Sequence, residues 1–240
     1  MRFLEADIKK LILNKEAVFG DLGESAIVFE KAIMRGNTIM DCMILSERQG
    51  VIGVEIKTER DTTRRLNKQL KDYEKVCDYV YVLCHDSHVL EVEKILQRYH
   101  KHVGILSYIA FKDEPMIGEY KKPKVSPLKD TEKTLDILWK TDIVNILGGF
   151  RSYGQQVQTA TGVKFFRNEE MSASKRYMAK TQSGATNLNK RQLIRNLIRK
   201  LGGPREATKV FCDVYIHPHQ DPDKMITYYH FNPSLREREE

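Results

Sequence analysis

The spacing of apolar residues changes from a helical period to an alternating one and back between residues 3 and 111. Phe3, Leu4, Ile8, Leu11 and Ile12 recur at helical spacing and predict a first helix. Beyond them, β-rich runs predict strands, and a 3.6-residue period between the runs predicts helices. In chain order we expect strands over residues 26–33, 39–45 and 51–57, a helix from Asp61 or Thr62 to Val76, a strand over 79–84, a helix over 89–100 and a strand over 103–111.

A second region follows a segment rich in proline and lysine. Residues 121–127 hold two prolines and three lysines and show no periodicity, which is typical of a linker. We expect a core at residues 1–120, a linker at 121–130 and a mainly helical region at 131–240. Within the last, the pattern predicts one helix over 131–147 that buries Leu135, Leu138, Trp139, Ile143 and Ile146 and stops at Gly148-Gly149, a polar and irregular loop over 151–187, and a helix over 189–201.

The positive charge of the chain is concentrated in that second region. The formal net charge is +7, yet residues 1–120 hold 18 Lys and Arg against 20 Asp and Glu, and residues 121–211 hold 19 against 7. A local surplus of this size is the electrostatic footprint of a polyanion binder and indicates nucleic acid. Arg191, Arg195 and Arg199 form a basic ridge at i, i+4 spacing, for which we expect contact with a DNA backbone; an ordinary solvated helix face is the alternative.

The composition excludes several other classes of protein. An apolar content of 41% over 240 residues suffices for one substantial core. Every apolar run is shorter than the roughly 18 residues that a membrane span needs, and the N-terminus is acidic too early for a secretory signal. We therefore expect a cytoplasmic protein with no membrane partner. The four cysteines lack metal-type spacing and predict reduced, buried thiols.

Charged residues of chemical interest lie where the hairpin strands would meet. Alternation places Glu55 and Lys57 on the same face of the strand at 51–57. If the turn is centred on Arg48, Asp41 of the preceding strand lies opposite Glu55. Two carboxylates so placed repel each other unless a positive charge lies between them. Their oxygen donors suit Mg²⁺ or Mn²⁺ better than zinc, so the pattern favours metal-assisted phosphodiester hydrolysis.

This arrangement resembles the PD-(D/E)XK nuclease superfamily, whose core has the order α-β-β-β-α-β with acids on the central hairpin. Gln69 and Tyr73 stand as Gln-x-x-x-Tyr, similar to the motif that follows the catalytic lysine in RecB-type nucleases. The run from Glu55 to Tyr73 also resembles a small family of bacterial and phage proteins placed in this superfamily. The resemblance covers roughly residues 1 to 110, and it implies an α/β fold with a restriction-endonuclease-like αβββαβ core. One departure is Met40, where the superfamily has a proline before the first acid.

The resemblance assigns roles to individual residues. It implies that Asp41 and Glu55 bind the metal, that the Ile56 carbonyl joins them, and that Lys57 is catalytic. Gln69 and Tyr73 would steady the site or the DNA backbone. Glu30 matches the upstream acid of the smaller family, with Glu24 and Glu5 as competitors.

Other interpretations of the same residues remain open at this stage. Lys57 could pair with Glu55 or Glu59 as a solvated strand end, and Tyr73 fits the apolar stripe of its helix without any function. Arg64 and Arg65, beside the expected site, are either phosphate contacts or a solvated helical turn.

The sequence thus predicts a metal-dependent deoxyribonuclease that acts on double- or single-stranded DNA. Its expected setting is phage or bacterial DNA processing, repair or defence, and a homodimer is possible. The alternatives are a non-catalytic DNA-binding accessory or regulatory protein with the same fold, and a sequence-specific restriction endonuclease whose specificity resides in loops such as 151–187.

Overall fold

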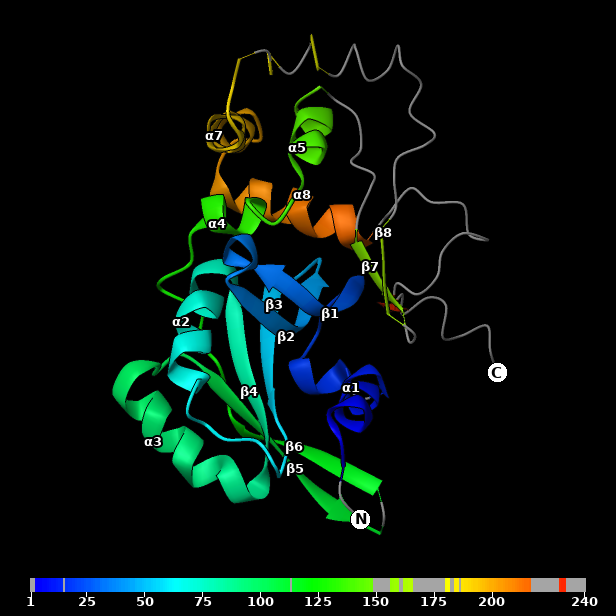
Figure 1. Ribbon diagram of the computed structural model, residues 1–240, viewed down its shortest axis with the longest axis vertical. Coiled ribbons are helices and arrows are strands. Elements are labelled where there is room, and N and C mark those ends of the chain that lie inside the picture. The colour runs from blue at the N-terminus through cyan, green and yellow to red at the C-terminus, as the bar shows by residue number, and fades with distance from the viewer. Residues whose placement is uncertain are drawn as a thin grey trace.

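The structure, a computed structural model, describes residues 3–14, 16–112, 114–148, 156–159, 162–165, 180–181, 184–185, 187–216 and 229–231. Up to residue 111, its helices and strands follow the order that the apolar pattern predicts (Figure 1). The elements are α1 (Glu5–Asn14), β1 (Ser25–Ile33), β2 (Thr38–Ser46), β3 (Gly50–Lys57), α2 (Leu66–Val76), β4 (Tyr79–His85), α3 (Val89–Tyr99), β5 (Gly104–Phe111) and β6 (Glu114–Lys121). The second half contributes α4 (Thr131–Leu135), α5 (Lys140–Leu147), β7 (Gln156–Thr159), β8 (Gly162–Phe165), α7 (Lys190–Lys200), α8 (Pro204–Ile216) and β9 (Tyr229–Phe231).

The described strands form one mixed sheet and a separate two-stranded ribbon of β7 and β8. The strand order of the sheet is β6-β5-β4-β3-β2-β1-β9. β3, β4 and β5 run parallel to one another, and their neighbours on both sides are antiparallel. The fold is therefore mixed α/β, as expected, and the carboxyl ends of β3, β4 and β5 meet at one edge of the sheet.

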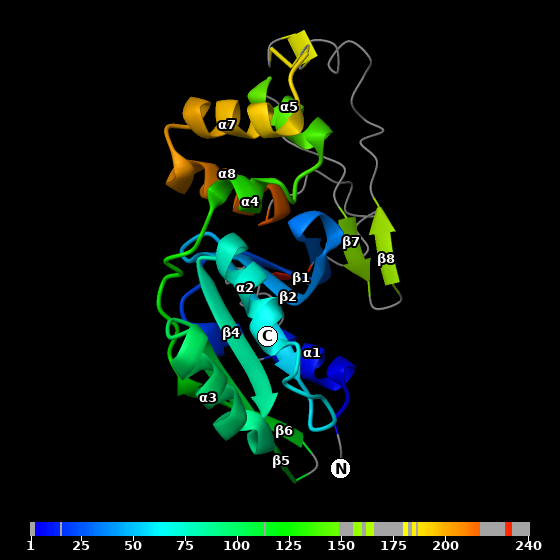
Figure 2. The same ribbon diagram turned by 60° about the vertical axis from the view of Figure 1, so that its left-hand side comes forward.

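Both faces of the sheet are buried, which explains why its central strands are apolar almost throughout. α1 covers one face, where its Ile8 and Ile12 belong to the same buried apolar cluster as Ile52 and Val54 of β3. α2 and α3 lie on the other face, as Figures 1 and 2 show from two sides. This second face carries the side chains of Val51, Glu55 and Lys57, so the alternation predicted for β3 is confirmed.

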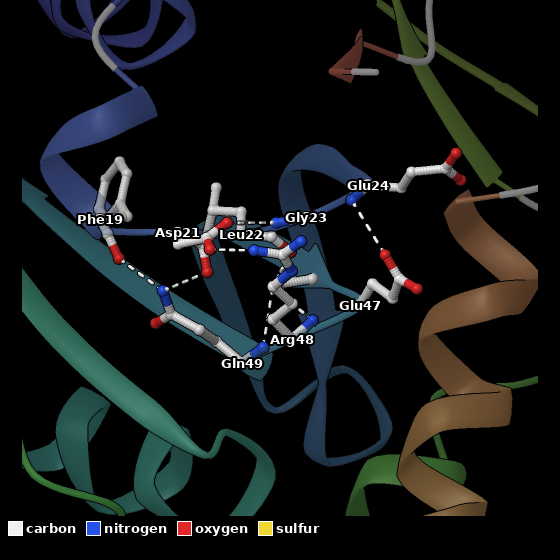
Figure 3. Close-up of polar contacts among 9 residues, drawn as sticks. Phe19, Asp21, Leu22, Gly23, Glu24, Glu47, Arg48 and Gln49 are labelled. Carbon is white, nitrogen blue, oxygen red and sulfur yellow. Dashed lines mark hydrogen bonds and ion pairs between the residues drawn. The ribbon is translucent and has the colours of Figure 1, made fainter. Parts of the chain in front are cut away.

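A short turn fixes the register of the β2–β3 hairpin. Leu45 pairs with Val51 and Met43 with Gly53, as a turn centred on Arg48 predicts. The preceding loop holds the turn, because the Gln49 side chain donates to the carbonyls of Phe19 and Asp21 (Figure 3). A register slip would break these contacts and would turn every side chain of β3 to the opposite face.

The C-terminal helices share the core of the sheet instead of forming a second one. One apolar cluster runs from Val51 and Leu70 to Leu135, Leu193 and Phe211. α8 contacts β1, β2 and β3, and α4, α5 and α7 gather around it at one end of the molecule (Figure 2). The segment predicted to be a linker also contacts this core, because the Ser126 hydroxyl donates to the Glu74 carbonyl of α2 at 2.7 Å.

Two predicted helix boundaries are wrong. The helix predicted over 131–147 is two helices, because Trp139 has extended backbone angles and its N–H donates to the Asp142 carboxylate at 2.9 Å. Trp139 is consequently 52% exposed, although the pattern placed it inside. α2 begins at Leu66 instead of Asp61 or Thr62, because Asp61 accepts hydrogen bonds from Thr58 in a preceding turn.

Two further differences concern strands that the pattern missed. β6 extends the sheet between residues 114 and 121, where glycine, proline and charged residues obscure its alternation. The ribbon of β7 and β8 lies within the region expected to be irregular; most of residues 151–187 lie outside the described residues. None of the described helices combines the length and the apolar character needed to cross a membrane.

Candidate active site

The hairpin brings Asp41 of β2 to the end of β3 that carries Glu55. The paired register extends from Ser46–Gly50 to Cys42–Val54, and Asp41 is the next residue along β2. One of its carboxylate oxygens, Oδ2, accepts a hydrogen bond from the backbone N–H of Ile56 at 2.8 Å. The two acids therefore lie on adjacent strands at the same level, as the sequence predicts.

Glu55 is fully buried and both of its carboxylate oxygens are engaged. Lys57 Nζ donates to Oε1 at 2.5 Å, and the Tyr73 hydroxyl donates to Oε2 at 2.5 Å. The exposed fraction is 0% for the Glu55 side chain and 10% for Lys57. A buried carboxyl group without such partners would be strongly unfavourable, so Lys57 and Tyr73 supply the hydrogen bonds that Glu55 needs inside the core.

α2 supplies the remaining two residues of the predicted set. Gln69 and Tyr73 are one helical turn apart, so both face β3. Gln69 Oε1 accepts from Lys57 Nζ at 3.4 Å, and Tyr73 Oη accepts from the Asp41 N–H at 3.0 Å. The hydrogen bonds thus connect Asp41, Glu55, Lys57, Gln69 and Tyr73, which we call the β2–β3–α2 network.

The network holds two acids and one lysine in a site that water reaches poorly. Burial, reinforced by the charge of Glu55, raises the pKa of Asp41 to about 7, while the Ile56 N–H and Lys57 oppose the rise. Burial and the same two carboxylates raise the pKa of Tyr73 well above its ordinary value, so its hydroxyl remains a donor. Asp41 is therefore the acid whose negative charge is least compensated by the protein.

The donor set suits a hard divalent cation. A cation between the two strands would compensate the charge of Asp41 and would find carboxylate oxygens, which Mg²⁺ and Mn²⁺ prefer. The part of the chain that the structure describes contains no group of three or more His, Cys, Asp or Glu arranged to hold a metal. Such an ion would accordingly be held by two carboxylates, with other oxygen atoms completing its shell.

Glu30 does not join these two acids. It lies on β1 with a left-handed backbone angle, φ 52°, and its carboxylate accepts from Lys9 of α1 at 2.7 Å. Glu5, one of the competing acids, pairs with the same lysine at 2.8 Å. The expected third acid is therefore bound to α1, and the metal-ligand role of the Ile56 carbonyl stays a prediction.

The predicted arginines fall into two groups. Arg64 and Arg65 are exposed in the connection between β3 and α2, directly beyond the network. On α7, Arg191 and Arg195 both pair with Glu132 of α4, at 3.3 and 2.8 Å, and Arg199 is exposed. Glu132 thus offsets part of the charge of the basic ridge that the sequence indicates.

The sequence pattern does not reveal the residues that hold the β3–α2 connection in place. His88 Nε2 lies 3.1 Å from the Thr58 carbonyl, and the Thr63 hydroxyl donates to Glu91 at 2.5 Å. Both contacts join positions about thirty residues apart, so no local pattern could indicate them. They fix the chain segment that leads from Lys57 to Arg64.

Comparison with known proteins places the chain in a family. Residues 1–202 of the 240 match the family model described as bacteriophage P4 protein cII. The chain belongs to this phage family. The match covers the whole β2–β3–α2 network, strands β1 to β6 of the sheet, and the C-terminal helices through α7. No curated protein and no solved structure gives a significant match.

The network makes a direct prediction for the Tyr73 hydroxyl. Tyr73→Phe keeps the packed ring but leaves Glu55 Oε2 and the Asp41 N–H without their partner. We expect the free energy of unfolding to fall by about 2 kcal/mol, measured by urea denaturation. Tyr81→Phe, at a buried tyrosine of β4, is the control. Equal losses for both variants would show that the hydroxyl of Tyr73 has no special role.

Proposed function

We propose that this chain is a metal-dependent nuclease that hydrolyses phosphodiester bonds of DNA. The observation that carries the proposal is the β2–β3–α2 network itself. Its five residues are those that sequence spacing and resemblance to PD-(D/E)XK nucleases indicate, and they lie within one set of hydrogen bonds. The order α1-β1-β2-β3-α2-β4 also supports a restriction-endonuclease-like core.

Each residue of the network has a role in this proposal. Asp41 and Glu55 would hold the metal, which when bound would lower the pKa of a water molecule and compensate charge on the phosphate. Lys57 Nζ, fixed by Glu55 and Gln69, orients the attacking water or offsets negative charge that develops on the phosphate oxygens. Tyr73 holds the Glu55 carboxylate in place through its hydroxyl, which also accepts from the Asp41 N–H of β2.

The surroundings of the network support a nucleic-acid substrate. Arg64 and Arg65 are exposed just beyond Lys57, where they can contact phosphates. The basic surplus of residues 121–211, with Arg199 exposed on α7, adds an electrostatic attraction for a polyanion. Membership of a phage family supports a role in phage or bacterial DNA processing, repair or defence.

A non-catalytic DNA-binding or regulatory protein is the second candidate. One observation favours it, because both Glu55 oxygens are already engaged by Lys57 and Tyr73, and Glu30 is held by Lys9. In such a protein the network would only stabilise the sheet. The two candidates differ in whether DNA is cleaved when a divalent metal is present.

Cleavage assays with a chelator control separate the two candidates. Purified protein is incubated with linear, circular, single-stranded and branched DNA in Mg²⁺ or Mn²⁺. We expect at least one form to be cut, and EDTA to stop the reaction. The nuclease proposal is falsified if every form stays intact in both metals while the protein still binds DNA, a result that supports the regulatory protein.

A further inference from the structure

The β5–β6 hairpin extends beyond the other strands at the edge where the parallel strands end. β4 ends at His85, which pairs with Tyr108, so residues 109–111 of β5 have only β6 beside them. The hairpin projects from the lower end of the sheet in both views (Figures 1 and 2). We call residues 109–112 and 114–117 the arm.

One face of the arm is apolar and exposed. Ile109 is 44% exposed, Phe111 51% and Met116 52%. Ile109 pairs directly with Met116, and Phe111 is two residues further along β5, so all three side chains share this face. The opposite face is covered at the base of the arm, where Tyr108 is buried and Ile117 packs in the cluster beneath α1, whereas Ala110 nearer the tip is exposed. The exposed face is thus an unburied surface on an anchored hairpin.

This face continues the face of the sheet that holds Glu55 and Lys57. Lys57 pairs with Cys84, and Cys84 pairs with Ser107, so the three residues form a row across β3, β4 and β5. Alternation then places Ile109 and Phe111 on the same side as Lys57. Two strand spacings and four residues along β5 put Phe111 roughly 17 Å from Lys57.

The surface around the network and the arm carries exposed cations that can contact a nucleic-acid strand. Arg64 and Arg65 are exposed in the β3–α2 connection, which Thr63 ties to Glu91 at the start of α3. Acids at this edge offset part of that charge: Asp86 accepts from Ser107 at 3.1 Å, and the exposed Glu114 pairs with Phe111 across the arm. Lys112 at the arm tip adds a cation, which lies over the Phe111 ring at 5.3 Å.

We propose that the exposed face of the arm is a platform for nucleic-acid bases. The bases stack on the ring of Phe111 and contact Ile109 and Met116. This deepens the proposed nuclease function and rests on it. A strand bound at Lys57 and passing Arg64 and Arg65 reaches the arm after about five stacked nucleotides. Because paired bases present no free face, the substrate carries unpaired or unstacked bases at that distance from the cut.

A second copy of this chain is a poorer occupant of the same face. Pairing of two β6 edges would require regular backbone donors, but β6 carries Pro115 near its start. Its remaining positions include Glu114, Glu119 and Lys121, charges that oppose edge-to-edge association. The apolar face is also narrow, since it comprises three large side chains.

The test uses a tryptophan placed on the arm. The chain has one tryptophan, Trp139, so Phe111→Trp combined with Trp139→Phe yields a single reporter. In EDTA, we expect its fluorescence to be quenched by a single-stranded oligonucleotide and not by heparin, which has charge but no bases. In parallel, Phe111→Ala with Met116→Ala should weaken binding of that oligonucleotide about tenfold.

Matched controls separate base contact from charge attraction and from self-association. Leu128→Ala, at a residue 53% exposed outside the arm, should bind like wild type. An abasic strand of equal length should bind wild type and the arm variant equally. The platform proposal is overturned if the arm variant binds the oligonucleotide as tightly as wild type and the oligonucleotide does not quench the tryptophan. It is also overturned if wild type is a dimer by mass and the arm variant is not. If DNA is cut normally despite that result, only the platform fails; if wild type neither binds nor cuts, the nuclease proposal fails too.

Discussion

Lys57→Met lowers the cleavage rate at least about a thousandfold and the free energy of unfolding by about 3 kcal/mol. The first effect follows because Lys57 is the cation of the network that can orient water or offset charge at the phosphate. The second follows because Glu55, 0% exposed, keeps only Tyr73 as a partner. Rates are measured on the DNA form that wild type cuts, and stability by urea denaturation.

The double variant Glu55→Gln with Lys57→Met separates these two effects. It removes both charges of the pair, so the buried site contains no uncompensated carboxylate, and much of the lost stability should return. Cleavage should stay absent. If the double variant regains activity together with stability, Lys57 acts only by keeping the protein folded, and the assignment of a catalytic lysine is wrong. A Lys57→Met protein that cuts at the wild-type rate leads to the same conclusion.

The elements around the network could be predicted because their signals are local. β3 alternates cleanly, its turn is short, and the register places Leu45 opposite Val51 with no freedom to slip. Gln69 and Tyr73 lie one helical turn apart, so finding one face of α2 locates both. These features depend on residues close in sequence.

The missed features depend on residues distant in sequence. Glu30 has the spacing of an upstream acid, but its carboxylate accepts from Lys9 of α1. The helix at 131–147 has a continuous apolar stripe, yet the Asp142 carboxylate bonds the Trp139 N–H and begins a new helix there. The arm was not foreseen as a surface, because exposure of Phe111 depends on where β4 ends.

Asp41→Asn abolishes cleavage and, at pH 8, stabilises the protein by about 2 kcal/mol. The sign of this change in stability follows from the pKa of Asp41. Burial and Glu55 raise the pKa of Asp41 from 3.8 to about 7, so the folded protein binds a proton more tightly than the unfolded chain does. The contribution of this group is fully present below about pH 4 and is lost as the pH rises to about 7. Asparagine keeps an oxygen for the Ile56 N–H and has no charge to bury.

A divalent cation should reverse this order of stability. At pH 8, millimolar Mn²⁺ raises the melting temperature of wild type by several degrees, because it binds the folded state through the ionised Asp41. Asp41→Asn should show no such rise, whereas Glu30→Gln, at the acid held by Lys9, should respond and cleave like wild type. A residue whose removal improves stability while ending activity is held at a cost for function. If Mn²⁺ has no effect on wild type and Asp41→Asn still cuts DNA, the metal does not lie between β2 and β3.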